Sequence, residues 1–218
     1  MSGTLSEYES KRLLAEAGIP VPDERLVATA EEAVEAAEAL GYPVVLKLCG
    51  RGIAHKTERN LVRLDLTDED LVHHQAEDLL ERRRPQESDA GILVATEIQG
   101  RREVIAGLLR DAVFGPCVML GLGGIFAEAL GEAAFAVAPL HSRDAEEMID
   151  ALAHARVLGE FRGEPPVDRT RLGQILEGLA RIGLERPDIH AIDLNPVILA
   201  GSEPIIADAL VELETPTR

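Results

Sequence analysis

The sequence is poor in aromatic residues and in positive charge, and it contains no tryptophan. Aromatic residues make up 3% of its 218 residues, so the stacking platforms that bind single-stranded nucleic acid are missing. Lysine and arginine number 22 against 39 aspartate and glutamate, which gives a formal net charge of -17. This charge repels nucleic acids and anionic membrane surfaces. We therefore expect neither as a partner, and any phosphate ligand has to be held by local amides, a few cations and a metal.

Cysteines and long apolar runs are also scarce. Cys49 and Cys117 cannot form a disulfide framework or a Cys-x-x-Cys metal site. The N-terminal segment is charged and amphipathic and lacks the apolar core of a signal peptide. No run approaches the roughly 20 apolar residues that cross a bilayer. We expect a cytoplasmic protein outside the membrane.

Periodicity and turn residues predict a mixed α/β (α+β) chain of two lobes. Thr29 and Thr67 are the expected N-caps of two early helices. We predict an N-terminal lobe over 1–88, and a C-terminal lobe over 89–218 built on one largely antiparallel sheet. The predicted helices cover 6–17, 31–41, 68–84, 144–158 and 169–184. The predicted strands cover 24–28, 44–48, 61–66, 91–98, 102–111, 117–124, 132–140, 189–199 and 203–213.

Two basic residues near the second predicted strand are candidates for phosphate chemistry. Lys47 lies on the apolar strand VVLKL, where a lysine is rare unless an anion pairs with it. The alternative is a lysine that reaches the strand edge and solvent. His55 follows in the loop CGRGIAHKTE, and a histidine nitrogen can carry a phosphoryl group. A loop histidine is more often a polar surface residue.

Two glutamates and a glycine-rich segment are weaker signals. Glu97 and Glu103 bracket a turn between two strands, where a carboxylate can accept hydrogen bonds from an amino group or from ribose hydroxyls. Either is equally an exposed edge residue. Gly123 and Gly124 end the segment GLGG, whose backbone can approach a phosphate closely. The segment does not match the dinucleotide fingerprint, and a tight bend with glycine for steric reasons explains it equally well.

Three oxygen donors near the C-terminus form a more specific set. The motif DLNP places Asp193 and Asn195 on the same face of a strand because side chains alternate. If the two last strands pair, Asp208 comes to that face as well. Three hard donors among apolar strands are costly unless they bind a cation, and Mg²⁺ fits them. The alternative is an Asx-turn with a solvated Asp208.

Together these segments resemble the ATP-grasp subunit or domain of the ADP-forming acyl-CoA synthetases (acetate–CoA ligase, ADP-forming), relatives of succinyl-CoA synthetase. The resemblance runs almost from end to end of the chain. The segments that carry it are LSEYESKRLLAEAGIPVP, VVLKL, AHKTE, REVIAGLLRDAVFGPCVMLGLGGIFAEAL, APL, the RG of EFRG, DLNP and ADAL.

This resemblance implies an ATP-grasp fold whose two lobes clamp ATP or ADP with Mg²⁺. It implies that Lys47 holds phosphates, that Glu97 reads adenine and that Glu103 lies at the nucleotide. It assigns Asn195 and Asp208 to the metal with support from Asp193. His55 then ferries phosphate on a mobile loop, and a CoA-binding alpha-type subunit completes the enzyme, in a heterotetramer.

The sequence departs from the family at one place and leaves two other hypotheses open. The family loop often reads HKxxxGGV, whereas Asn60 and Leu61 replace the glycine pair here, which puts the movement of the loop in question. One alternative is a noncatalytic nucleotide-binding regulatory subunit. Another is an ATP-grasp ligase that joins a carboxylate to an amine and needs no His55. The acid and the choice between adenine and guanine are left open.

Overall fold

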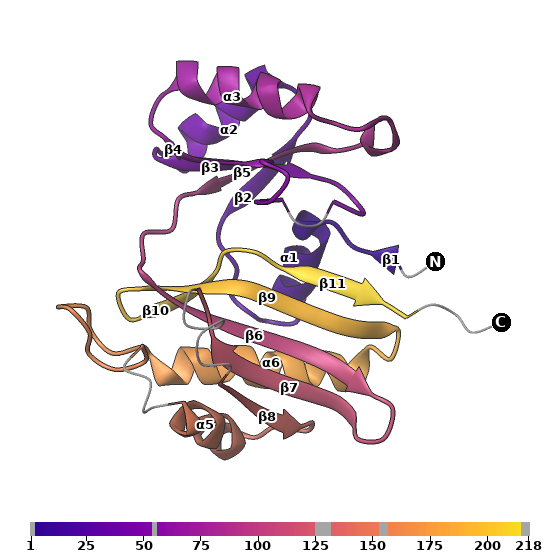
Figure 1. The fold of residues 1–218 in the computed structure, drawn as a ribbon, viewed down its shortest axis with the longest axis vertical. Coiled ribbons are helices and arrows are strands. Elements are labelled where there is room, and N and C mark those ends of the chain that lie inside the picture. Colours follow the sequence, from indigo (N-terminus) through magenta and orange to yellow (C-terminus); the bar gives the residue numbers. More distant parts are fainter. Residues whose placement is uncertain (1–2, 54–55, 125–131, 153–156, 215–218) are drawn as a thin grey trace. The chain divides into compact units, whose positions relative to one another are not determined.

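The computed structural model describes residues 3–53, 56–124, 132–152 and 157–214 (Figure 1). The chain packs as two compact units. The small unit contains residues 4–9 and 22–97, and the large unit contains residues 1–3, 10–21 and 98–218. In the described part of the chain, no helix is long and apolar enough to cross a membrane.

The small unit is a four-stranded antiparallel sheet with two helices on one face (Figure 1). The strands, in their order across the sheet, are β2 (Glu24–Val27), β5 (Gly91–Thr96), β3 (Val44–Cys49) and β4 (Val62–Leu66). The helices are α2 (Ala30–Leu40) and α3 (Glu69–Glu81), and a short 3₁₀ helix, η1 (Pro85–Glu87), precedes β5.

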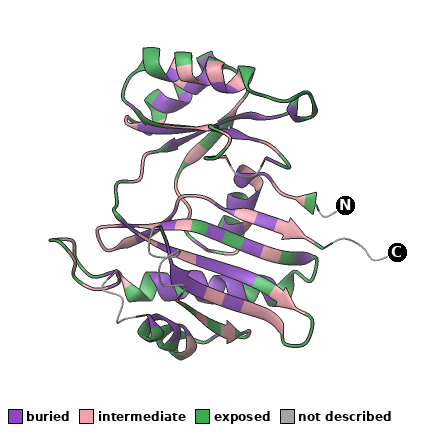
Figure 2. Ribbon diagram, in the orientation of Figure 1, coloured by how far each residue is buried: buried purple, intermediate pink, exposed green. Residues whose placement is uncertain are grey.

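Alternation along β3 separates the core of the small unit from its other face. Val44, Leu46 and Leu48 are fully buried and belong to the same apolar cluster as the alanines of α2 (Figure 2). Because side chains alternate along a strand, Lys47 lies on the face opposite to the two helices. The packing of the core therefore determines the face of the sheet on which the Lys47 side chain lies.

The helix starts agree with the predicted caps at one helix and differ at the other. Thr29 caps α2, and its hydroxyl accepts from the Glu32 amide at 3.2 Å. Asp68, rather than the predicted Thr67, caps α3 by accepting from the Leu71 amide at 3.0 Å. An aspartate carboxylate at the N-cap also interacts favourably with the helix dipole, which explains why Asp68 takes the position.

The predicted boundary between residues 88 and 89 needs a correction. The sequence analysis assigns the strand at 91–98 to the C-terminal lobe, but β5 lies between β2 and β3 in the small unit. Its first five residues are buried, as expected of an inner strand with neighbours on both sides. The units therefore change between Glu97 and Ile98.

The large unit is built on a seven-stranded sheet in the order β1–β11–β9–β6–β7–β8, with β10 also paired to β9. Helices α5 and α6 lie together on one face of this sheet (Figure 1). The strands are β1 (Gly3–Thr4), β6 (Arg102–Asp111), β7 (Gly115–Leu122), β8 (Ala133–Val137), β9 (Ile189–Ala200), β10 (Glu203–Ile206) and β11 (Leu210–Leu213). The helices are α1 (Glu7–Glu16), whose first turn belongs to the small unit, α5 (Ser142–Ala151) and α6 (Arg169–Glu185).

The C-terminal segment forms two strands rather than the single predicted strand over 203–213. Both β10 and β11 pair antiparallel with β9, and residues 207–209 between them are not in a strand. The interruption lies opposite Pro196, whose carbonyl accepts from the Ala207 amide at 3.0 Å. Because proline has no N–H to donate to the ladder, regular pairing stops there, and the chain is free to turn Asp208 out of strand geometry.

A buried arginine fixes the polar loop that precedes α6. Arg102, at the start of β6, is 3% exposed, and its guanidinium makes five hydrogen bonds of 2.5 to 3.1 Å. Its acceptors are the Glu164 carboxylate and the backbone carbonyls of Val157, Gly159, Pro165 and Gly201. An arginine has five N–H donors, so every donor can be satisfied and the cost of burying the charge is offset.

We expect Arg102→Met to lower the free energy of unfolding by about 3–5 kcal/mol, because it leaves a partly buried carboxylate and several carbonyls without a donor. Arg143→Met is the control, since Arg143 forms an exposed pair with Glu147 and its loss costs at most about 0.5 kcal/mol. Urea unfolding measures both changes. Equal effects of the two substitutions would contradict the assigned role of Arg102.

Candidate functional site

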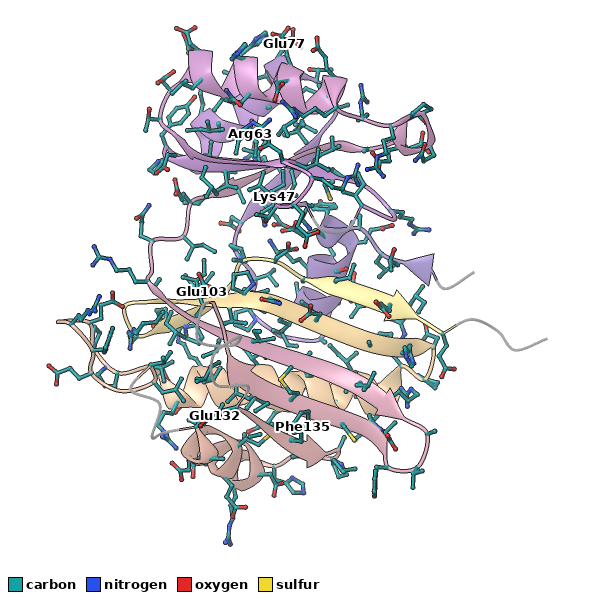
Figure 3. All side chains as sticks on the ribbon, viewed as in Figure 1. Lys47, Arg63, Glu77, Glu103, Glu132 and Phe135 are labelled. Carbon is teal, nitrogen blue, oxygen red and sulfur yellow. The ribbon has the colours of Figure 1, made fainter. Side chains whose placement is uncertain are left out.

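Lys47 meets an anion inside the small unit, as a buried lysine requires. Its side chain is 12% exposed, and its Nζ lies 2.6 Å from Oε1 of Glu7, whose side chain is 1% exposed (Figure 3). Glu7 begins α1, so a helix end supplies the carboxylate that stabilises the strand lysine. The interpretation of Lys47 as a solvated lysine at the strand edge is therefore wrong, and its role toward phosphate stays a prediction.

The same carboxylate also holds a lysine of the loop that carries the candidate histidine. Lys56 Nζ lies 3.0 Å from Oε2 of Glu7. Glu7 thus bridges Lys47 on β3 and Lys56 directly after His55. His55 itself lies outside the described residues. Sequence reasoning missed Glu7, because an acidic residue in the first turn of a helix is ordinarily explained by the helix dipole.

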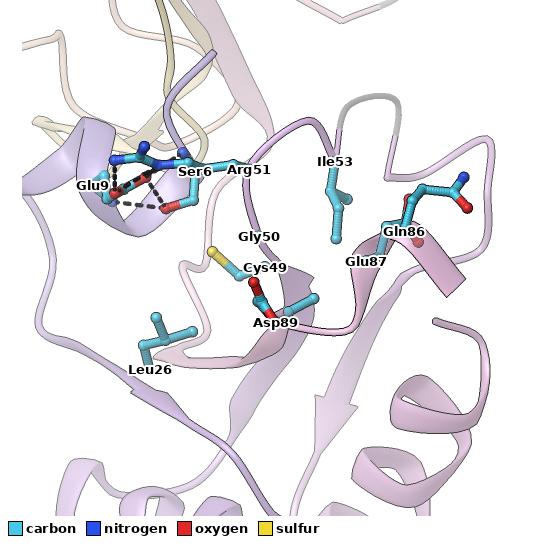
Figure 4. Close-up of a pocket in the computed structure, with 11 residues that line it drawn as sticks. Ser6, Glu9, Leu26, Cys49, Gly50, Arg51, Ile53, Gln86, Glu87 and Asp89 are labelled. Carbon is cyan, nitrogen blue, oxygen red and sulfur yellow. Dashed lines mark hydrogen bonds and ion pairs between the residues drawn. The ribbon is translucent and has the colours of Figure 1, made fainter. Parts of the chain in front are cut away.

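The loop between β3 and β4 is tied down on either side of its central histidine. Arg51 contacts Glu9 through two nitrogens, with Nη2 at 2.6 Å and Nε at 3.0 Å from Oε1 (Figure 4). The Arg51 guanidinium holds the pKa of Glu9 at about 2, well below the usual 4.5. Arg59 pairs with Glu87 at 2.8 Å. These pairs connect the loop to α1 and to η1.

A pocket of about 370 Å³ lies beside this loop in the small unit (Figure 4). Carboxylates and apolar side chains form much of its wall. A wall of this kind is unsuited to a phosphate. Its lining residues are Ser6, Glu9, Leu26, Cys49, Gly50, Arg51, Ile53, Gln86, Glu87, Asp89 and Ala90.

Asn60 and Leu61, which replace the family's glycine pair, fit the loop in different ways. Asn60 has φ 55°, a left-handed conformation in which asparagine is the best tolerated residue after glycine. Its side-chain and backbone oxygens both accept from Arg63. Leu61 is 2% exposed and packs in the core of the small unit. Position 60 therefore has a backbone conformation that glycine also adopts readily.

Glu97 and Glu103 belong to different units. Glu97 follows β5, its amide donates to the Pro43 carbonyl at 3.1 Å, and its carboxylate accepts from the Asp65 amide at 3.1 Å. It is the last residue of the small unit along the chain. Glu103 lies on β6 in the large unit (Figure 3). The predicted roles of both residues at a nucleotide stay predictions.

Gly123 and Gly124 pack directly against Glu103. The Gly123 amide donates to the Glu103 carbonyl at 2.9 Å, and a Cβ on Gly123 would lie 2.9 Å from the Glu103 Cβ. Gly124 has φ 61°. Steric and conformational reasons for glycine are thus present at both positions. The same residues line a pocket of about 390 Å³, whose wall is Arg101, Glu103, Gly123, Gly124, Phe161, Arg162 and Glu164.

Asp193 and Asn195 lie on one face of β9, and Asp208 lies near enough to Asp193 for its charge to act on that carboxyl. Asp193 and Asn195 are exposed on β9, and Leu194 between them is fully buried, so strand alternation holds. Leu210, two residues after Asp208, is the partner of Asp193 across the ladder. Although the residue as a whole is exposed, partial desolvation of its carboxyl, and then the charges of Asp208 and Glu212, raise the pKa of Asp193 above its usual value.

This donor set fits a hard divalent cation. Among the described residues no group of three or more His, Cys, Asp or Glu forms a metal site, and the set here is two carboxylates and an amide. Mg²⁺ takes few protein oxygens and completes its shell with water and phosphate. Carboxylates that repel one another in the empty site are stabilised when a cation lies between them.

Helix α1 contacts the backbone on either side of Asp208, which sequence reasoning did not anticipate. Lys11 is 1% exposed, and its Nζ donates to the Ala207 carbonyl at 3.1 Å, one residue before Asp208. The Ser10 hydroxyl accepts from the Val211 amide at 3.1 Å. The sequence signal that could have indicated these contacts is the pair of polar residues Ser10 and Lys11 inside an amphipathic helix. Helix α1 therefore holds the chain on both sides of Asp208, in the segment between β10 and β11.

The comparisons with known proteins agree with this architecture. The model of the ATP-grasp domain family matches residues 1–213. The beta subunit of acetate–CoA ligase [ADP-forming] I from Pyrococcus furiosus is 36% identical over 94% of this chain and 90% of its own length.

Solved structures of a related enzyme are similar over nearly the whole chain. The dinucleotide forming acetyl-coenzyme A synthetase 1 of Ca. Korarchaeum cryptofilum, in complex with coenzyme A, Ca-AMPCP and HgCl+, is 38% identical with a TM-score of 0.90, covering 97% of this chain and 94% of that one. The same enzyme with coenzyme A and Mg-AMPPCP has its phosphohistidine segment pointing towards the nucleotide binding site, with 38% identity, a TM-score of 0.82 and coverage of 95% and 92%.

The two antiparallel sheets and the match over residues 1–213 define an ATP-grasp domain. Within this class, the chain belongs to the family of the beta subunits of ADP-forming acetate–CoA ligases. The resemblance found in the sequence motifs and the predicted fold class are confirmed.

We expect Arg51→Gln to raise the pKa of Glu9 from about 2 toward 4.5, as followed by NMR titration of the carboxyl carbon. Because the folded pKa is lowered, the pair stabilises the fold above pH about 4.5, and this contribution is lost as the pH falls toward 2. Arg12→Gln, on the same helix but in an exposed pair with Glu16, should leave the Glu9 titration in place. An unchanged midpoint in the Arg51 variant would contradict the assignment.

We expect Asp193→Asn to stabilise the protein in EDTA at neutral pH, by a few tenths to about 1 kcal/mol, because it removes repulsion from Asp208 and Glu212. The same substitution should weaken Mg²⁺ binding, measured by calorimetry. Glu185→Gln removes an exposed charge elsewhere in the large unit and should change neither quantity. Destabilisation of the Asp193 variant in EDTA would speak against a repulsive, cation-seeking site.

Proposed function

We propose that this chain is the nucleotide-binding subunit of an ADP-forming acyl-CoA synthetase, which catalyses acyl-CoA + ADP + phosphate ⇌ carboxylic acid + CoA + ATP. The observation that carries this proposal is the match to a beta subunit over nearly the full length of both chains. The placement of Asp193 and Asn195 on one face of β9, with Asp208 near Asp193, supports it independently, because such a set of oxygen donors suits a divalent cation.

In this proposal the residues of the chain bind and orient the nucleotide. Lys47 holds phosphate oxygens, and it exchanges its contact with Glu7 for them. Glu97 accepts hydrogen bonds from the adenine amino group. Glu103 lies at the nucleotide with Gly123 and Gly124, where the absence of Cβ atoms permits a close approach.

Asp193, Asn195 and Asp208 hold Mg²⁺ in this proposal. Once bound, Mg²⁺ neutralises charge on the phosphate oxygens during phosphoryl transfer. The task of the protein residues is to keep the donors on one face, and Lys11 does so through the carbonyl of Ala207.

His55 relays the phosphoryl group in this mechanism. Its imidazole nitrogen takes the group from a histidine of the partner subunit, so that a P–N bond breaks there and forms on His55. Transfer to ADP then breaks the bond to His55 as a terminal oxygen of ADP bonds to phosphorus, and neutral imidazole is regenerated. Lys56, next to His55, keeps its contact with Glu7 while the loop is on the small unit.

The remaining components come from a second protein. A CoA-binding alpha-type subunit forms the acyl phosphate and selects the acid, and the two subunits assemble as a heterotetramer in the cytoplasm. The structures of the related enzyme that contain coenzyme A support the need for such a partner. The noncatalytic alternative rested on the altered loop, and the left-handed backbone of Asn60, which glycine would also adopt readily, weighs against it.

The test is to incubate the chain with Mg²⁺ and γ-labelled ATP, with and without a CoA-binding alpha subunit. We expect acid-labile, base-stable label on the wild-type protein and its absence on His55→Ala, because a P–N bond has this stability whereas phosphate esters and acyl phosphates do not. His74→Ala is the matched control, since His74 lies on α3 away from the loop.

Calorimetry should show that His55→Ala binds nucleotide as the wild type does. The loss of label then reports on phosphoryl transfer through His55 and not on nucleotide binding. Label on His55→Ala, or none on the wild type with the alpha subunit present, would overturn the proposed mechanism.

A further inference from the structure

The pocket of the large unit has an arginine at its wall that adopts a costly backbone conformation. Phe161 and Glu164 face each other across a tight turn, with N–H to carbonyl distances of 3.2 and 2.9 Å in the two directions. The central residues Arg162 and Gly163 have φ 50° and φ 84°. Two positive φ values in a two-residue turn define type I′, which favours Asn, Asp or Gly at the first position. Arginine there costs on the order of 1 kcal/mol.

Such a conformation persists only where the surroundings determine it, and here they do. Arg102 binds the Gly159 carbonyl before the turn, and the Glu164 carboxylate and the Pro165 carbonyl after it. Both flanks of the turn are therefore fixed to the first residue of β6. Strain that is held in place by a buried network is typical of functional positions.

The side chain of Arg162 is positioned yet available to a ligand. Its guanidinium carbon lies 5.1 Å from the centre of the Phe161 ring, a cation–π distance. Arg162 is exposed, and the ion pairs found among the described residues do not involve it. In a chain with a net charge of -17, where most arginines are paired with carboxylates, an arginine that stacks on a ring and faces a pocket is suited to an external anion.

The pocket joins this arginine to residues already assigned to the nucleotide. Glu103, Gly123 and Gly124 line it together with Arg101 and Arg162. A guanidinium fork matches the oxygens of a phosphate bidentately. We propose that Arg162 of the large unit binds the phosphate groups of the nucleotide. It thereby makes the protein prefer nucleoside diphosphates to nucleosides. This inference rests on the proposed function.

The sharpest test is Arg162→Asn in the full chain, because asparagine keeps the left-handed turn while the guanidinium is lost. We expect the affinity for Mg-ADP to fall by about 10- to 100-fold, the effect of losing hydrogen bonds to a charged partner. The affinity for adenosine, which has no phosphate, should not change. Calorimetry measures both, with Ala in place of His55 in every protein so that no phosphohistidine competes for Arg162.

Three comparisons complete the experiment. Arg162→Gly also keeps the turn and should reproduce the loss for ADP, whereas Arg162→Lys keeps the charge without the fork and should bind ADP with intermediate affinity. Arg143→Asn removes an arginine from α5 outside the pocket and should have no effect. Free phosphate should compete with ADP more weakly in Arg162→Asn than in the parent protein.

The outcomes separate this inference from the proposed function. Equal ADP affinity of the parent and Arg162→Asn would overturn the role of Arg162 and leave the proposed function intact. An equal loss for ADP and adenosine would also overturn it, because it would indicate a collapsed pocket. Failure of the parent protein to bind ADP would overturn both.

Discussion

A single buried guanidinium organises the part of the large unit that contains its pocket. Burying an arginine removes a strongly hydrated charge from water, and the cost is tolerable only when its donors all find acceptors. Arg102 meets this condition by collecting carbonyls from a segment about 60 residues away in sequence. The proline-containing loop before α6 buries Leu158 and Val167 in the core, and the hydrogen bonds of Arg102 give a defined shape to the polar stretch between them.

The molecule has a net negative charge, but positive side chains gather at a few places. The chain is strongly acidic, yet Lys47 and Lys56 converge on one carboxylate in the small unit, and Arg101 and Arg162 line the pocket of the large unit. An acidic exterior keeps nonspecific polyanions away, while a few preorganised cations give a specific anion its contacts. Glu7 stabilises two largely buried lysines, and in the proposed function it is also the anion that a phosphate replaces.

Most of the fold was accessible from the sequence, and the errors have physical causes. Helices with caps and apolar periodicity, such as α2 and α6, and the strands β3, β6 and β7 were predicted close to their observed bounds. The assignment of β5 failed because an apolar strand carries no information about which sheet it joins. The shared face of Asp193 and Asn195 was predictable, since alternation along β9 needs only local geometry. Glu7, Lys11 and Arg102 were not, because their partners are distant in sequence and contact arises only through tertiary packing.

The left-handed backbone at Asn60 bears on how members of this family are recognised. A search pattern that demands two glycines after the His-Lys pair would reject this chain, although Asn60 adopts a left-handed backbone that glycine also adopts readily. What such a position requires is a torsion angle, which glycine supplies at the least cost and asparagine also supplies. Classification by backbone conformation, with asparagine and aspartate admitted at such positions, would group sequences that a literal motif divides.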